Sequence, residues 1–101
     1  MSERYSLHQL EDIISPIARR FGVEKVSVFG SYSRGEADDQ SDVDLLIEKG
    51  GLRSLFQLSG FRLELEDALR LPVDLVTTES SDREFLDRIA KESVVLYGKQ
   101  G

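Results

Sequence analysis

Residues 28–48 read VFGSYSRGEADDQSDVDLLIE, and in this stretch two apolar runs flank a connection rich in glycine, small hydroxyl residues and carboxylates. The first run ends at Gly30, and the second opens with Asp42-Val43-Asp44. Apolar residues at every second position are typical of strands, whereas glycine and clustered polar residues are typical of turns. The stretch therefore predicts two strands joined by a turn that gathers negative charge at one end of a sheet.

The size and composition of the chain predict one folded domain over residues 1–101. Hydrophobic residues make up 40% of the chain and charged residues 32%, which is ordinary for a soluble globular protein. No cysteine is present, which excludes a disulfide framework and a Cys-ligated metal. The sequence has neither an apolar run long enough for a membrane span nor a secretory leader, so we expect a cytoplasmic protein.

The formal net charge is −6, from 19 acidic and 13 basic residues. This sign disfavours an extended surface that tracks the phosphates of DNA or RNA. An anionic substrate would therefore need local help from a metal ion or a helix end.

Apolar spacing in the first half predicts a helix over 7–21, which stops at Gly22 and which Pro16 should kink or divide. Strands are expected over 23–29 and 43–47. In the second half, a helix over 52–69 is expected to turn five apolar residues toward the core: Leu55, Leu58, Phe61, Leu65 and Leu69.

The last part of the chain predicts a strand, a helix and a short edge strand. The strand over 73–76 follows Pro72, a helix opens with a capping box of Ser81 and Glu84, and the edge strand covers 94–97. The order of elements predicts an α/β (α+β) domain in which helices pack on one small mixed sheet.

Neither the P-loop, a common phosphate-binding motif, nor the EF-hand, a common metal-binding motif, matches the connection between these two strands. Gly30 and Gly35 have P-loop spacing, but Glu36-Ala37 stands where that motif needs Lys and Ser or Thr. An EF-hand loop counted from Asp38 would place Val43 at the required glycine and a lysine at the required glutamate.

Alternate residues of a strand share a face, so Asp42 and Asp44 should point the same way while Val43 enters the core. Such a pair can hold two metal ions, and its oxygen ligands favour Mg²⁺ or Mn²⁺ over zinc. A third carboxylate, Asp74, is expected to lie buried within the apolar strand Val73–Val76 on the same face. Asp42 as a turn cap, Asp44 as a solvent-facing strand residue and Asp74 as a salt-bridged edge residue remain as structural alternatives.

The turn itself suits phosphate. The backbone amide of Ser31 begins a short helix and can hold the terminal phosphates of a nucleotide, while Gly30 permits a close approach. Arg34 either contacts a phosphate or pairs with Glu36 or Asp38 on the surface.

Together, Gly30-Ser31, the ten-residue gap, Asp42-Val43-Asp44 and Asp74 resemble the signature of the DNA polymerase β-type nucleotidyltransferase superfamily. The segments VFGSYSRGEA, SDVDLLIE and LPVDLVT, in so short a chain, are similar to its minimal (MNT-type) branch. The resemblance covers nearly the whole chain and implies a polymerase β palm-like fold.

The resemblance also implies chemistry and a partner. Asp42 and Asp44 would bind both metals, and Asp74 would bind one and help to activate a hydroxyl that attacks the α-phosphorus of ATP or another nucleoside triphosphate. Members of the branch often pair with an all-helical HEPN-type protein as the antitoxin of a toxin–antitoxin couple. The alternatives are a nucleotide-binding antitoxin without catalysis and an enzyme that modifies a small molecule such as an antibiotic.

Overall fold

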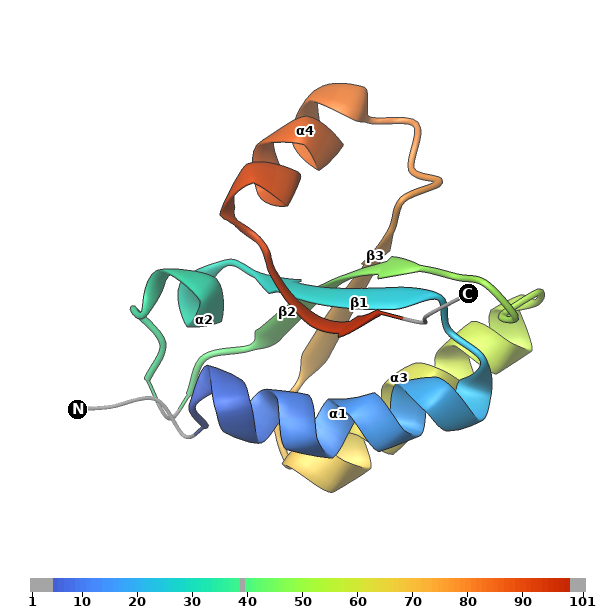
Figure 1. Ribbon diagram of the computed structural model, residues 1–101, viewed down its shortest axis with the longest axis horizontal. Coiled ribbons are helices and arrows are strands. Elements are labelled where there is room, and N and C mark those ends of the chain that lie inside the picture. The colour runs from blue at the N-terminus through green and yellow to red at the C-terminus, as the bar shows by residue number, and fades with distance from the viewer. Residues whose placement is uncertain (1–4, 39, 99–101) are drawn as a thin grey trace.

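The computed structural model describes residues 5–38 and 40–98, which form four helices and four strands (Figure 1). In chain order the elements are α1 (Leu7–Phe21), β1 (Lys25–Phe29), α2 (Ser31–Arg34), β2 (Val43–Glu48), α3 (Leu55–Leu69), β3 (Val73–Thr77), α4 (Arg83–Glu92) and β4 (Val94–Gly98). The predicted order is confirmed, and so is the class of helices packed on a small mixed sheet.

The four strands form one sheet in the order β3-β2-β1-β4. β1 is antiparallel to both of its neighbours, whereas β2 and β3 are parallel and are joined through α3. β3 and β4 are therefore the two edge strands, and the strands that carry Gly30 and Asp44 at their ends lie in the middle.

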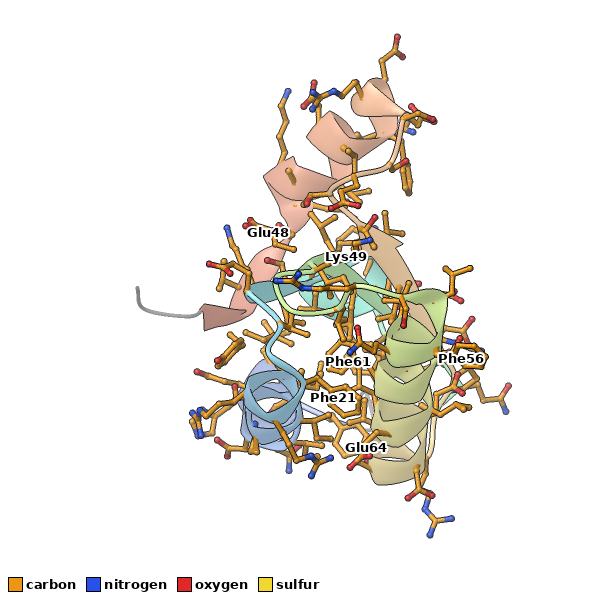
Figure 2. All side chains as sticks on the ribbon, turned by 90° about the vertical axis from the view of Figure 1, so that its right-hand side faces the viewer. Phe21, Glu48, Lys49, Phe56, Phe61 and Glu64 are labelled. Carbon is orange, nitrogen blue, oxygen red and sulfur yellow. The ribbon has the colours of Figure 1, made fainter. Side chains whose placement is uncertain are left out.

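One face of the sheet carries the main core beneath α1 and α3 (Figure 1). Val43, Leu45 and Ile47 alternate along β2 as fully buried residues. Phe21 of α1 and Phe61 of α3 meet between the two helices, with ring centroids 5.4 Å apart (Figure 2). The period-2 pattern of β2 thus sends every apolar side chain of this set to one face and leaves Asp44 on the other.

The opposite face is covered by α4 alone, over a small apolar cluster. Leu86 and Ile89 of α4 pack there with Phe29 at the end of β1. Asp44 is the register partner of Phe29, so the carboxylate shares this less covered face. No helix in the described ranges is both long and apolar enough to cross a membrane.

One prediction about helices is answered in part and another is wrong. α1 runs as one helix through Pro16, so the proline does not divide it, and its exposed position lets solvent hydrate the carbonyl that lacks an amide partner. α4 is capped by Asp82, whose side chain accepts the Phe85 amide, so the predicted capping box of Ser81 and Glu84 does not form.

α3 begins three residues later than predicted, after the cap Ser54. Leu55 is consequently in the first turn and 81% exposed, not in the core, and Phe56 points away from the sheet with 91% exposure (Figure 2). Phe61, Leu65 and Leu69 are fully buried as predicted.

Candidate active site

Asp44 and Asp74 are brought side by side by the parallel pairing of β2 and β3. They are register partners in that ladder, and partners in register point to the same face of a sheet. Neighbouring strands lie about 4.8 Å apart, so the two carboxyl groups project together from the face that α4 covers only in part.

The proximity of these carboxylates changes the acidity of Asp44. Partial burial, and then the negative charges of Asp74 and Asp42, raise the pKa of the Asp44 carboxyl to about 6. A hydrogen bond with Asp74 acts in the same direction, whereas the positive charge of Arg34 lowers the pKa. Asp42, Asp44, Asp74 and Arg34 therefore share one electrostatic neighbourhood.

Asp42 and Asp74 differ from Asp44 in their exposure. Asp42 lies just before β2 and is exposed. Asp74 is also exposed, and the prediction that it is buried is wrong because it lies on an edge strand and on the less covered face of the sheet. None of the ion pairs within residues 5–38 and 40–98 involves Asp74, which removes the support for a salt-bridged structural role.

Gly30 closes the site on the side of β1. Its φ of +77° and ψ of −148° belong to a region that is essentially restricted to glycine. A Cβ added at this position would lie 2.4 Å from Oδ2 of Asp44, so the backbone passes directly over the carboxylate. The backbone conformation requires glycine here, and a side chain would also force the Asp44 carboxylate to move.

The short helix α2 follows Gly30 at the end of β1 (Figure 1). Ser31 is its first residue, and an amide at this position has no carbonyl partner within the helix. The turn is fixed from inside, because the Gly30 carbonyl accepts the Ser33 hydroxyl at 2.8 Å and the Arg34 amide at 3.2 Å.

Arg34 pairs with Glu36 at 2.9 Å and with Glu92 at 3.2 Å. Of the two surface partners considered from the sequence, Glu36 is confirmed, and the described contacts of Arg34 do not include Asp38. Glu92 was not predicted as part of the site. It follows Arg34 by 58 residues, and no local pattern marks it.

The carboxylate oxygens are the hard ligands that Mg²⁺ and Mn²⁺ prefer. A cation would offset both the burial and the repulsion that raise the pKa of Asp44. Within residues 5–38 and 40–98, no group of three or more Asp, Glu, His or Cys side chains is arranged so that it could hold a metal ion. The donor chemistry thus fits a divalent cation at Asp44 and Asp74, with the exposed Asp42 beside them.

The family model for "Polymerase beta, Nucleotidyltransferase" matches residues 11–101. The chain belongs to this nucleotidyltransferase family. The resemblance seen in the sequence is thereby confirmed, and the chain is a nucleotidyltransferase enzyme.

Two curated archaeal relatives span most of the chain. The protein adenylyltransferase MntA of Thermococcus cleftensis is 37% identical over 93 residues, which are 88% of this chain and 94% of that protein. A relative from Methanocaldococcus jannaschii, provisionally named as a protein adenylyltransferase, is 38% identical over 89 residues, or 88% of this chain and 96% of that protein.

Two solved structures share the fold. One, provisionally described as a minimal nucleotidyltransferase, has a TM-score of 0.77 at 30% identity and covers 90% of this chain and 96% of its own. The other is a toxin–antitoxin complex with AMP-PNP, in which the matching chain has a TM-score of 0.76 at 25% identity and covers 89% of this chain and 74% of its own.

Proposed function

We propose that this nucleotidyltransferase transfers AMP from ATP to a hydroxyl group of a partner protein, and that the partner is a helical HEPN-type toxin. The observation that carries the proposal is the pairing of Asp44 with Asp74 beside the Gly30 turn. It joins a carboxylate pair suited to divalent cations with a backbone turn suited to phosphate. The relatives named as protein adenylyltransferases support a protein acceptor.

In the proposed reaction, the acceptor oxygen attacks the α-phosphorus of ATP and forms a new phosphorus–oxygen bond. The bond between that phosphorus and the bridging oxygen breaks, and pyrophosphate leaves with the electron pair. Asp74 accepts the proton of the hydroxyl, a role for which its exposed place at the edge of the sheet is suitable.

The remaining residues orient the nucleotide. The Ser31 amide and the Arg34 guanidinium hold the β- and γ-phosphates, and Gly30 allows the chain to approach them without a side chain. Asp42, Asp44 and Asp74 would hold two Mg²⁺ or Mn²⁺ ions, which when bound increase the acidity of the attacking hydroxyl and stabilise the leaving pyrophosphate.

The acidic chain suits a protein acceptor better than a nucleic acid, since its net charge of −6 repels polyphosphate. Modification or covering of a toxin would make the chain an antitoxin, and the solved toxin–antitoxin complex with AMP-PNP supports this assembly.

The test is a transfer assay with α-labelled ATP, Mg²⁺ and a HEPN-type protein encoded beside the chain. We expect the label to appear on the partner, and Asp44→Asn to reduce the rate by a factor of order 10² or more. Asp67→Asn, on the exposed surface of α3, is the matched control and should transfer at the wild-type rate. Transfer by Asp44→Asn at the wild-type rate would disprove the site.

A further inference from the structure

Glu92, the last residue of α4, contacts two donors of the phosphate side of the site at once. Its Oε2 accepts the backbone amide of Gly30 at 2.9 Å and lies 3.2 Å from the Arg34 guanidinium, and its Oε1 lies 3.4 Å from the same nitrogen. The Glu92 side chain is 31% exposed, so solvent screens these contacts only in part.

The contact on Gly30 constrains the turn from a second direction. Asp44 leaves no room for a Cβ on the α-carbon of Gly30, while Glu92 holds the amide of the same residue. Gly30 is therefore fixed between two carboxylates. Loss of the Glu92 contact would remove one of these two constraints on the turn.

The contact on Arg34 fixes the direction of its side chain. Two carboxylates hold the guanidinium, but Glu36 is 65% exposed and lies only two residues from Arg34. Glu36 makes the shorter contact, 2.9 Å against 3.2 Å, but the anchor from a separate element is the less exposed Glu92. It comes from the far end of the chain and ties α4 to α2.

We propose that Glu92 is a positioning residue for nucleotidyl transfer. It holds the Gly30 turn and Arg34 in the relative arrangement that receives the nucleotide phosphates, and it does not itself touch the nucleotide. The inference rests on the proposed role of Ser31 and Arg34 as phosphate ligands.

A purely structural role for Glu92 has a close parallel elsewhere in the chain. Glu66 of α3 accepts the Val73 amide at 2.9 Å, pairs with Arg62 at 3.5 Å and is 27% exposed. It makes the same kinds of contact with groups to which no phosphate role is assigned. Glu66 is therefore a matched control for the stability that such contacts provide.

The experiment compares four variants in melting temperature, in affinity for Mg²⁺-AMP-PNP and in steady-state transfer from labelled ATP. Glu92→Ala loses the contacts with both Gly30 and Arg34. We expect kcat/KM to fall by a factor of order 10², because the Gly30 turn is no longer held in place relative to Asp44. Glu92→Gln keeps an amide oxygen for Gly30 but loses the charge for Arg34, so KM for ATP should rise about tenfold while kcat stays near the wild-type value.

Glu66→Ala and Glu66→Gln should lower the melting temperature as much as the Glu92 variants and leave kcat/KM within about twofold of wild type. The positioning role is overturned if Glu92→Ala leaves both kcat/KM and AMP-PNP affinity at wild-type values. It is also overturned if Glu66→Ala lowers these two quantities as much as Glu92→Ala does. In either case the proposed function stands. A wild-type chain that neither binds AMP-PNP nor transfers AMP overturns both.

Discussion

Gly30 and Gly35, the two glycines that bound α2, provide a matched test of the close approach to Asp44. Both have positive φ, +77° and +72°, but a Cβ on Gly35 meets nothing within 4 Å. Gly35→Ala should destabilise the fold by about 1 kcal/mol. Gly30→Ala should destabilise it more, by up to ~3 kcal/mol for the glycine-only dihedral angles, and should abolish transfer because the methyl group displaces the Asp44 carboxylate. Denaturant unfolding and the labelled-ATP assay measure the two effects.

The clash also predicts that the two positions are coupled. Truncating the carboxylate in Asp44→Ala removes the atom that lies 2.4 Å from the added Cβ, so part of the stability lost in Gly30→Ala should return in the double variant. Additive losses across the cycle would show that the strain at Gly30 comes from its dihedral angles alone.

The raised pKa of Asp44 predicts how stability depends on pH. The Asp44 carboxyl has a pKa of about 6 in the folded chain, against its ordinary value of 3.8. The folded state therefore keeps a proton that the unfolded state releases, and stability should fall as pH rises from about 4 to about 6. Without divalent cations, Asp44→Asn should lose this decline and gain about 1 kcal/mol at pH 7, after allowance for solvent screening.

Thermal melts from pH 4 to pH 8 test this prediction, with Asp67→Asn as the control that keeps the wild-type profile. Addition of Mg²⁺ at pH 7 should raise the melting temperature of the wild type more than that of Asp44→Asn, because the ion neutralises the carboxylates that repel each other. A wild-type profile that is flat between pH 4 and pH 6 would contradict the electrostatic coupling.

The sequence located the residues of the candidate site through spacing, because short connections and period-2 strands fix which side chains share a face. Asp44 and Gly30 follow from one continuous stretch. The exposure of Asp74 did not follow, since the sequence does not state which strand lies at an edge. Glu92 could not be found, because its contact with Gly30 spans 62 residues and depends on how α4 packs.

Among the elements, α1 shows how packing overrides a local signal. Pro16 lies inside the helix, yet Ile14, Ile17 and Ala18 around it are buried and hold the helix against the sheet. Pro16→Ala should restore an amide donor to an exposed turn and raise the stability, by up to ~3 kcal/mol. Chemical denaturation measures the gain.

A loss of stability in Pro16→Ala would mean that the local geometry imposed by proline is needed for the neighbouring contact of α1 with the edge strand. That contact is the hydrogen bond from the Ser15 hydroxyl to the Leu96 carbonyl, at 3.2 Å. Ser15→Ala is the control that removes this bond and leaves Pro16 in place.

Element types were predictable because each has a strong periodic pattern, whereas boundaries and caps were not. In α3, apolar residues occur on both sides of the helix, so the pattern could not decide that Phe56 faces solvent and Phe61 the core. In α4, Ser81 and Asp82 are both good caps, and the chain path after β3 selects Asp82.

At the scale of the whole molecule, four arginine and lysine side chains within residues 5–38 and 40–98 form ion pairs with acidic residues: Arg20, Arg34, Lys49 and Arg62. Ion pairs join residues of separate elements or loops: Arg20 with Glu64, Arg34 with Glu92, and Lys49 with Glu79. The net charge of −6 is unfavourable for a surface that tracks the phosphates of a polymer. In the proposed function, Arg34 and backbone amides hold a single nucleotide, and a track for a polymer is not needed.

This charge distribution predicts that DNA and RNA neither bind nor compete. At 150 mM salt, the dissociation constant for single-stranded RNA or duplex DNA should be weaker than about 10⁻⁴ M, since there are few phosphate contacts from which counterions could be released. Excess RNA should then leave the rate of AMP transfer to the protein partner unchanged. Fluorescence anisotropy at several salt concentrations, together with the transfer assay in the presence of RNA, measures both. Tight binding whose affinity falls steeply with salt would reveal a surface that tracks phosphates. Inhibition of transfer by the same RNA would show that a nucleic acid competes with the protein hydroxyl for the site of Asp44 and Asp74.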